Sequence, residues 1–97
     1  MGMGYAITED GKMRDGHTLA DNYATYIIPT SLDCPDIAVY PVEVLEKTGP
    51  FGAKGIAEAL CTTIAPAIIN AIYDAIGVRI SSLPATMEKV FMAIQEQ

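Results

Sequence analysis

Apolar residues recur every three or four positions in the second half of the chain, between residues 64 and 76. This spacing predicts a helix with one apolar face. The residues on that face are Ile64, Ile68, Ile69, Ile72 and Ile76. Gly77 is a typical C-terminal stop. Pro66 suits a first helical turn, so we expect the regular helix to begin near residue 63 and residues 58–62 to form an irregular or separate turn.

A second helix is predicted for residues 86–95, where Thr86 is a favourable N-cap and Val90, Phe91 and Ile94 fall on one face. Residues 1–8 resemble the end of a further helix, because their apolar side chains are too dense to be solvated on every side. This stretch contains two glycines and is shorter than the roughly 12–15 residues that a marginal isolated helix needs. It therefore looks like the tail of a longer element.

The polar and β-branched segments between these helices predict extended structure. Asp10-Gly11 and Asp15-Gly16 are typical of turns with positive φ, and a short strand is expected between them at residues 12–14. Residues 37–44 alternate well enough to form a strand, with Pro41 placing it at a sheet edge. The predicted fold is α+β: a small antiparallel sheet from the middle of the chain, packed by two main helices at about 63–76 and 86–95.

The composition suggests that some apolar residues contact a surface outside this core. A chain of 97 residues forms one domain at most, and a domain of this size hides only roughly 60–65% of its unfolded surface. Hydrophobic residues nevertheless make up 51% of it, so extra apolar surface is expected to meet a partner. The net charge of −6, with six Lys plus Arg and no basic stripe, argues against nucleic-acid binding.

Membrane and metal roles are also disfavoured by the pattern. The longest apolar-rich run, residues 64–76, is too short to span a bilayer and contains polar residues. The N-terminus has no basic start followed by a long apolar run, so a cytoplasmic location is expected. Cys34 and Cys61 form no CxxC pair and no zinc-type spacing with His17, and both are interpreted as reduced thiols.

The sharpest candidate for chemistry is Glu58, which follows the glycine-rich stretch 49–55. Glycines allow a close approach of the backbone to a bound group, and the following turn presents free N–H groups. A carboxylate desolvated among the neighbouring apolar side chains would have a raised pKa, which suits a general base. The alternative is an acidic residue placed in a first helical turn by the helix dipole, and the pattern alone favours that alternative. The stretch is not a nucleotide loop, because Lys54 is followed by Gly55.

Four separated motifs then carry a resemblance across nearly the whole chain. They read MGMGYAITE, TLADNYATYIIPTSLDCPDIAVYPVE, TGPFGAKGIAEA and APAIINAIYDAIGVRISSLPATMEKV. In this order and at this spacing they resemble the C-terminal end of the molybdenum-binding large subunit of the xanthine dehydrogenase and aldehyde oxidase family. The family commonly has glycine where this chain has Ala57, and often proline where it has Ala59.

The resemblance implies that residues 1–97 are a single C-terminal segment of a molybdopterin-binding domain, not autonomous as an enzyme. It implies that Glu58 is the general base for oxidative hydroxylation of an N-heterocycle or aldehyde, with water as the oxygen source. The loop residues Gly55, Ile56 and Ala57 would approach the molybdenum cofactor, and no residue of the chain would bind the metal itself.

By the same resemblance, the partners are the rest of the large subunit and subunits that carry iron–sulfur clusters and, in some enzymes, FAD. The isolated chain is expected to hold no cofactor. A different interpretation stays open: a non-catalytic remnant or interaction module that folds and self-associates as a homo-oligomer through its apolar surface.

Overall fold

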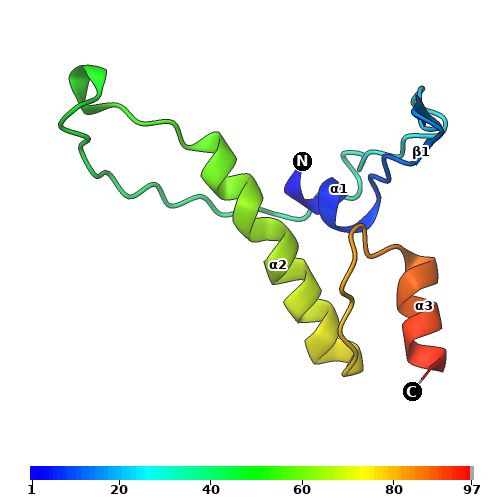
Figure 1. Cartoon of the computed structure of the whole chain (residues 1–97). Helices are drawn as coiled ribbons and strands as arrows, with labels where there is room; N and C mark the ends of the chain where they lie inside the picture. The colour runs from blue at the N-terminus through cyan, green and yellow to red at the C-terminus, as the bar shows by residue number, and fades with distance from the viewer. Residues whose placement is uncertain (97) are drawn as a thin grey trace.

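The computed structural model describes residues 1–96 and has the expected α+β class. A small hairpin and a long excursion of the chain project from the three helices (Figure 1). The elements in order are α1 (Gly2–Ile7), β1 (Met13–Arg14), β2 (His17–Thr18), the 3-10 turn η1 (Pro50–Gly52), α2 (Ala57–Ile76) and α3 (Met87–Gln95).

The best-packed part of the molecule is the crossing of α1 and α2, which lie side by side near the centre (Figure 1). A Cβ atom added at Gly2 would lie 2.7 Å from Cβ of Ile64, so only glycine permits this approach. Ala6 and Ala65 are buried at this crossing, and the backbone N–H of Ala85 donates a 2.7 Å hydrogen bond to the Ala6 carbonyl. We call α1, α2 and residues 77–96 the body of the segment.

The predicted N-terminal helix is present, but its buried residues are the small ones and not the large apolar ones that the sequence pattern suggested. Its buried positions are Gly2, Gly4 and Ala6, whereas Met1 is 90% exposed and Tyr5 is 58% exposed. Small residues allow the two backbones to approach, and the larger side chains are left pointing away. The apolar residues of α1 therefore provide unpartnered surface rather than core.

The sheet is a single two-stranded hairpin near the N-terminus, not a sheet from the middle of the chain as expected. Met13 pairs with Thr18 and Arg14 with His17. The turn is formed by Asp15 and Gly16, which have φ angles of 50° and 79°, as the Asp-Gly pattern predicts. The same prediction was wrong for Asp10-Gly11, because Gly11 is not among the residues with positive φ.

Residues 34–56, which we call the arm, leave the body and return to it as a long open loop (Figure 1). None of them is buried. The strand predicted at residues 37–44 is wrong: this stretch has no regular secondary structure. A strand requires a neighbour for its backbone hydrogen bonds, and within residues 1–96 no other segment pairs with it.

Helix α2 begins at Ala57, several residues earlier than predicted, and Pro66 lies inside it. The expectation of an irregular turn at residues 58–62 is therefore wrong. Ala57, Glu58, Ala59 and Leu60 are strong helix formers that extend the helix on the N-terminal side of the proline. Thr62 Oγ1 donates a 3.0 Å hydrogen bond to the Glu58 carbonyl one turn earlier.

The predicted helix ends are confirmed at two other places. Gly77 ends α2 in the left-handed conformation, with φ of 74°, and its N–H donates to the Tyr73 carbonyl. Thr86 caps α3, and its hydroxyl oxygen accepts a 3.3 Å hydrogen bond from the Lys89 N–H. Both ends are specified by residues within one turn, which is why local sequence predicts them.

The surface of the segment is large for its mass. It exposes 8262 Å², against about 5,400 Å² for a compact monomer of this size. The Cα radius of gyration is 17.2 Å, where a compact domain of this length has about 12.5 Å. The buried hydrophobic residues of the described chain are Ala6, Ala65 and Ala85. Most of the large apolar side chains are thus left for another surface to cover.

Candidate functional site

Glu58 lies in the first turn of α2. The arm rejoins the body at the start of this helix (Figure 1). Gly55 belongs to the non-helical link before it, Ile56 is the N-cap residue, and Ala57 begins the helix. All four are exposed. The structure therefore brings the predicted site residues together at one end of one helix, and it places Glu58 where the helix-dipole interpretation expects an acidic residue.

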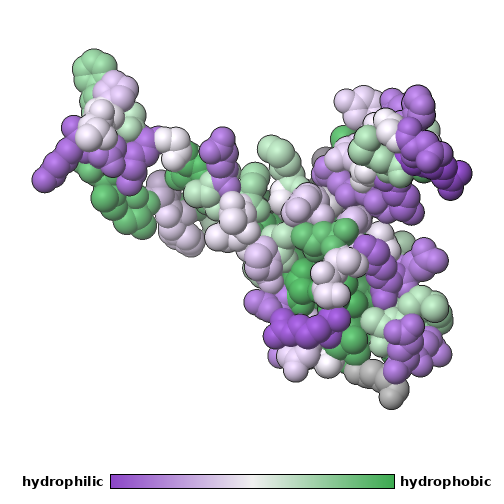
Figure 2. All heavy atoms as spheres, viewed as in Figure 1, coloured by the Kyte–Doolittle hydropathy of each residue, from purple (hydrophilic) through white to green (hydrophobic). Residues whose placement is uncertain are grey.

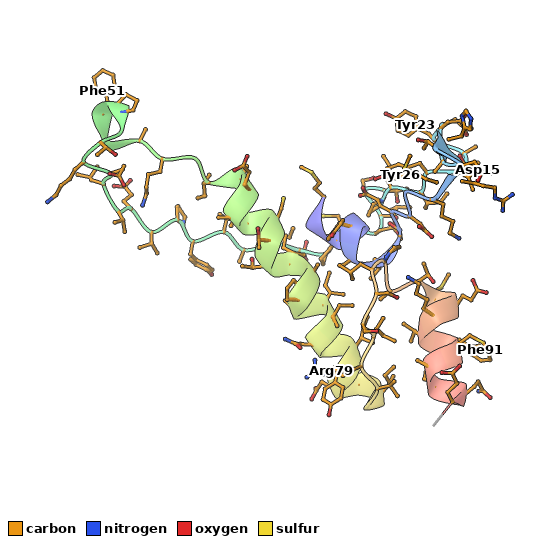
Figure 3. The ribbon with its side chains drawn as sticks, in the orientation of Figure 1. Asp15, Tyr23, Tyr26, Phe51, Arg79 and Phe91 are labelled. Carbon is orange, nitrogen blue, oxygen red and sulfur yellow. The ribbon has the colours of Figure 1, made fainter. Side chains whose placement is uncertain are left out.

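A compact turn at the tip of the arm directs the chain toward this site. The N–H of Glu46 donates to the Gly52 carbonyl at 3.1 Å and closes the turn. Phe51 and Gly52 have positive φ angles of 54° and 76°, and the Phe51 ring projects into solvent (Figure 3). The positive φ of Gly52 favours glycine, and a Cβ there would lie 2.7 Å from Cδ2 of the exposed Leu45 side chain, which can move aside.

The carboxylate of Glu46 stabilises the same turn. It accepts hydrogen bonds from the Thr48 N–H at 3.0 Å and from the Thr48 hydroxyl at 2.9 Å. These bonds, the backbone one most of all, lower the pKa of Glu46 from its ordinary value. The tip is thus ordered by short-range hydrogen bonds, although it is far from the body.

The N-terminus of α2 is open in the direction of the link. Within residues 1–96, no side chain caps the helix at Ile56. The N–H groups at the start of a helix have no partner within it and attract anions or oxo groups. A Cβ atom at Gly55 would meet nothing within 4 Å, so there is space beside the link for a bound group. The backbone donors and this free space would suit a group rich in oxygen atoms.

The environment predicted for Glu58 is not provided by this segment. We expected neighbouring apolar side chains to desolvate the carboxylate, but Ile56 is 64% exposed and Leu60 is 56% exposed, and Glu58 is exposed with them. On a helix, residues adjacent in sequence point in different directions and do not enclose one another. Any desolvation of Glu58 has to come from a surface outside residues 1–96.

The other candidate residues lie elsewhere. Lys54 is exposed in the link, and His17 is exposed in the hairpin. Cys34 and Cys61 are free thiols, the first exposed and the second half-buried. Within residues 1–96, no group of three His, Cys, Asp or Glu side chains is arranged to hold a metal ion.

Two polar contacts outside the arm were not visible in the sequence. The Tyr26 hydroxyl donates a 2.6 Å hydrogen bond to the Glu9 carboxylate, so this tyrosine does not simply present its hydroxyl to solvent. That bond raises the pKa of Tyr26. Arg79 donates to Asn70 at 2.7 Å, and its guanidinium lies 4.0 Å from the centre of the Tyr73 ring (Figure 3). Both contacts lie away from Glu58.

Apolar grooves run along the helices. One of about 610 Å³ is bordered by Tyr5, Cys61 and Leu83, and another of about 630 Å³ by Ile27 and Phe91 among others. Hydrophobic residues also gather in the arm and along the central helix (Figure 2). An exposed apolar surface of this extent marks a contact region rather than a solvated face.

Known proteins match this segment in sequence and in structure. It is 37% identical over 97 residues to a probable xanthine dehydrogenase subunit of Bacillus subtilis (strain 168), covering 100% of this chain and 13% of that protein. It is 32% identical over 93 residues to the aldehyde oxidoreductase molybdenum-binding subunit PaoC of Escherichia coli (strain K12), covering 93% of this chain and 13% of that protein. No protein-family model matches the chain.

Its fold matches that of quinoline 2-oxidoreductase from Pseudomonas putida 86 with a TM-score of 0.85 and 30% identity, over 99% of this chain and 13% of that one. The matched proteins are oxidoreductases, and the match is to a part of each. The chain belongs to the xanthine dehydrogenase and aldehyde oxidase family of molybdenum hydroxylases, as a segment of the large subunit. It spans about 13% of the length of these relatives.

Proposed function

We propose that this segment is the C-terminal part of a molybdenum-hydroxylase large subunit and that it contributes Glu58 as the general base. The observation that carries the proposal is the position of Glu58: an exposed carboxylate at the uncapped start of α2, beside the open link at Gly55. No atom lies within 4 Å of a Cβ position at Gly55, which leaves space for a cofactor and a substrate next to Glu58.

The proposed work of Glu58 is proton transfer. Its carboxylate accepts a proton from the water-derived hydroxyl group that attacks an electron-poor carbon of an N-heterocycle or an aldehyde. When the rest of the large subunit covers Glu58, the loss of hydration makes the carboxylate a better proton acceptor.

The molybdenum cofactor, when bound, supplies the two-electron oxidation of the substrate carbon. Backbone N–H groups of Gly55, Ile56 and Ala57 would hold its oxygen-rich edge, and Gly55 would leave room for it. Subunits with iron–sulfur clusters and, in some enzymes, FAD would carry the electrons onward. We place the assembled enzyme in the cytoplasm.

The apolar helix α2 could lie either in a membrane or in the interior of a large protein. Residues 50–76 are long and apolar enough to cross a membrane by length and composition, so the argument that the apolar run is too short was wrong. A core helix of a large protein meets the same criteria. Because α2 carries Glu58, Asn70 and Asp74 as well as Pro66, we assign it to the interior of the large subunit.

The test is Glu58→Gln in the assembled enzyme. Glutamine keeps the size of the side chain and removes the proton acceptor, so turnover should fall by roughly 10²–10⁴-fold while molybdenum content stays unchanged. The matched control is Glu88→Gln, because Glu88 is also an exposed acid in the first turn of a helix, α3. It should leave turnover unchanged.

Three results would decide against the proposal. Wild-type turnover in Glu58→Gln would end the assignment of the base. Equal losses in the two variants would trace the effect to helix stability rather than to proton transfer. A folded, self-associating chain that never combines with the rest of a large subunit would favour a non-catalytic interaction module, whose sign in this structure is the exposed apolar surface.

A further inference from the structure

Helix α2 is interrupted at Pro66, between the turn that carries Glu58 and the rest of the helix. Pro66 has no N–H group, so the backbone hydrogen bond from residue 66 to the Thr62 carbonyl is missing. A proline ring inside a helix also crowds the carbonyl four residues earlier and is a common cause of a bend. The turns before Pro66 are therefore joined to the rest of α2 less firmly than in an uninterrupted helix.

The tight contact of α2 with α1 lies beside this interruption. Gly2 approaches Ile64, and Ala65 is the buried residue of α2. Residues 57–63 contain no buried residue. Packing on α1 therefore fixes the helix near Pro66, whereas the direction of the turn that carries Glu58 depends on bonds within the helix itself.

The first turn of α2 is closed by one long bond and one short bond. The Leu60 N–H donates to the Ile56 carbonyl at 3.4 Å, and within residues 1–96 no side chain caps the helix at Ile56. The Thr62 hydroxyl donates to the Glu58 carbonyl at 3.0 Å. A threonine bond to the carbonyl four residues earlier commonly bends a helix. In α2 this bond acts on the backbone of Glu58.

Thr62 takes part in both irregularities of the helix. Its carbonyl is the one that loses its helical donor at Pro66, and its hydroxyl reaches the Glu58 carbonyl. The residue thus connects the backbone of Glu58 to the point where α2 is interrupted. The neighbouring Thr63 makes a similar bond, at 3.1 Å, but to the Leu60 carbonyl. The two threonines are therefore a matched pair in which one bond reaches Glu58 and the other does not.

We propose that Thr62 is a positioning residue for Glu58: its hydroxyl, together with the interruption at Pro66, sets the direction in which the first turn of α2 presents the carboxylate. This inference rests on the proposed role of Glu58 as the general base. Thr62 acts through the Glu58 backbone and not by contact with the substrate. Misplacement of a reacting group by about 1 Å can lower a rate up to 10²-fold, so the loss of one hydroxyl bond at this position should be measurable.

Thr62→Val in the assembled enzyme tests the proposal, because valine keeps the branched shape and removes the hydroxyl. We expect turnover per bound molybdenum to fall about tenfold. Thr62→Ser keeps a hydroxyl that can make the same bond, so its turnover should stay within about threefold of wild type. Equally low turnover in Thr62→Ser and Thr62→Val would overturn the proposal.

The matched control is Thr63→Val, which removes the similar bond to the Leu60 carbonyl. Thr63 is exposed, and the change should alter turnover less than about twofold. Equal losses in Thr63→Val and Thr62→Val would show that any weakening of this turn lowers turnover, and would overturn the special role of Thr62.

The same substitution in a Glu58→Gln background separates positioning from stability. If Thr62 acts through the Glu58 carboxylate, Thr62→Val should cause less than about a twofold further loss once that carboxylate is gone. A loss of about tenfold in both backgrounds would show a structural role and would overturn the positioning alone. Wild-type turnover in Glu58→Gln would instead end the assignment of the base and, with it, the positioning, so the two failures are distinguishable.

Discussion

The body and the arm differ in where their contacts are found. The body has internal contacts: Gly2 lies against Ile64, and Ala85 is hydrogen-bonded to Ala6. The arm has no buried residue, and its ordered tip depends on hydrogen bonds within a few positions of the chain. Glu58 lies where the two regions meet. The difference shows that one region can be explained from this segment, while the other needs a surface outside it.

After Glu58→Gln, the largest effect is expected at Gly55, on the arm side of the junction. Within this segment a methyl group at Gly55 meets nothing, so Gly55→Ala should leave the segment's fold unchanged. In the assembled enzyme the same methyl would occupy the space assigned to the cofactor, and misplacement by about 1 Å can cost up to 10²-fold. We expect turnover to fall at least tenfold.

The control for this prediction is Gly11→Ala. Gly11 also has free space around its Cβ position and no positive φ, but it lies near the hairpin. Turnover and molybdenum content measured together should change only in Gly55→Ala. If the two variants were equally active, Gly55 would not lie beside the cofactor.

An intermediate effect is expected in the body, at Gly2. A methyl group there would lie 2.7 Å from Cβ and Cδ1 of Ile64, and the Ile64 Cβ cannot rotate away. Overpacking costs about 1–3 kcal/mol, which exceeds the gain of helix propensity at a helix end. Gly2→Ala should lower the urea midpoint of the chain's helical circular-dichroism signal. An unchanged midpoint, relative to Gly11→Ala, would mean that the crossing of α1 and α2 does not hold the body together.

The smallest effects are changes with pH, and they should have opposite directions in the arm and in the N-terminal part of the chain. The pKa of Glu46 is lowered by Thr48, so its contribution to the arm's tip is present above the ordinary glutamate pKa and is lost as pH falls through the lowered value. The pKa of Tyr26 is raised by its bond to Glu9, so that contribution is present below the ordinary tyrosine pKa and is lost as pH rises through the raised value.

Nuclear magnetic resonance can follow both titrations in one sample. The Thr48 amide should shift on the acid side and the Tyr26 ring on the alkaline side. A Thr48 amide that does not move during acid titration would show that Glu46 does not order the tip. Glu46 and Tyr26 are only half-buried, so the changes should remain local and should not unfold the chain.

Sequence predicted the features that are set within one turn of the chain. The Thr86 cap, the Gly77 stop and the turn at Asp15-Gly16 each depend on adjacent residues, and each is present. It did not predict the early start of α2, because the helix formers before Pro66 outweigh the usual preference of proline for a first turn.

The remaining errors concern contacts with groups outside the segment. Residues 37–44 have the composition of a strand, but strand pairing needs a neighbour that residues 1–96 do not supply. The helix-dipole alternative placed Glu58 in a first helical turn, as observed, although residues 58–62 were expected to be irregular. The expected desolvation of Glu58 was wrong for this segment, since no residue nearby in sequence covers it. The order of four motifs identified the family because it draws on the whole chain rather than on one site.

The most direct test of the account compares molybdenum content and hydroxylase activity in the chain alone and in the chain assembled with the rest of a large subunit and its partner subunits. The account predicts neither stoichiometric molybdenum nor turnover for the purified chain alone, and both after assembly. Stoichiometric molybdenum in the chain alone would contradict the claim that Glu58 becomes functional only when another part of the enzyme brings the cofactor to it.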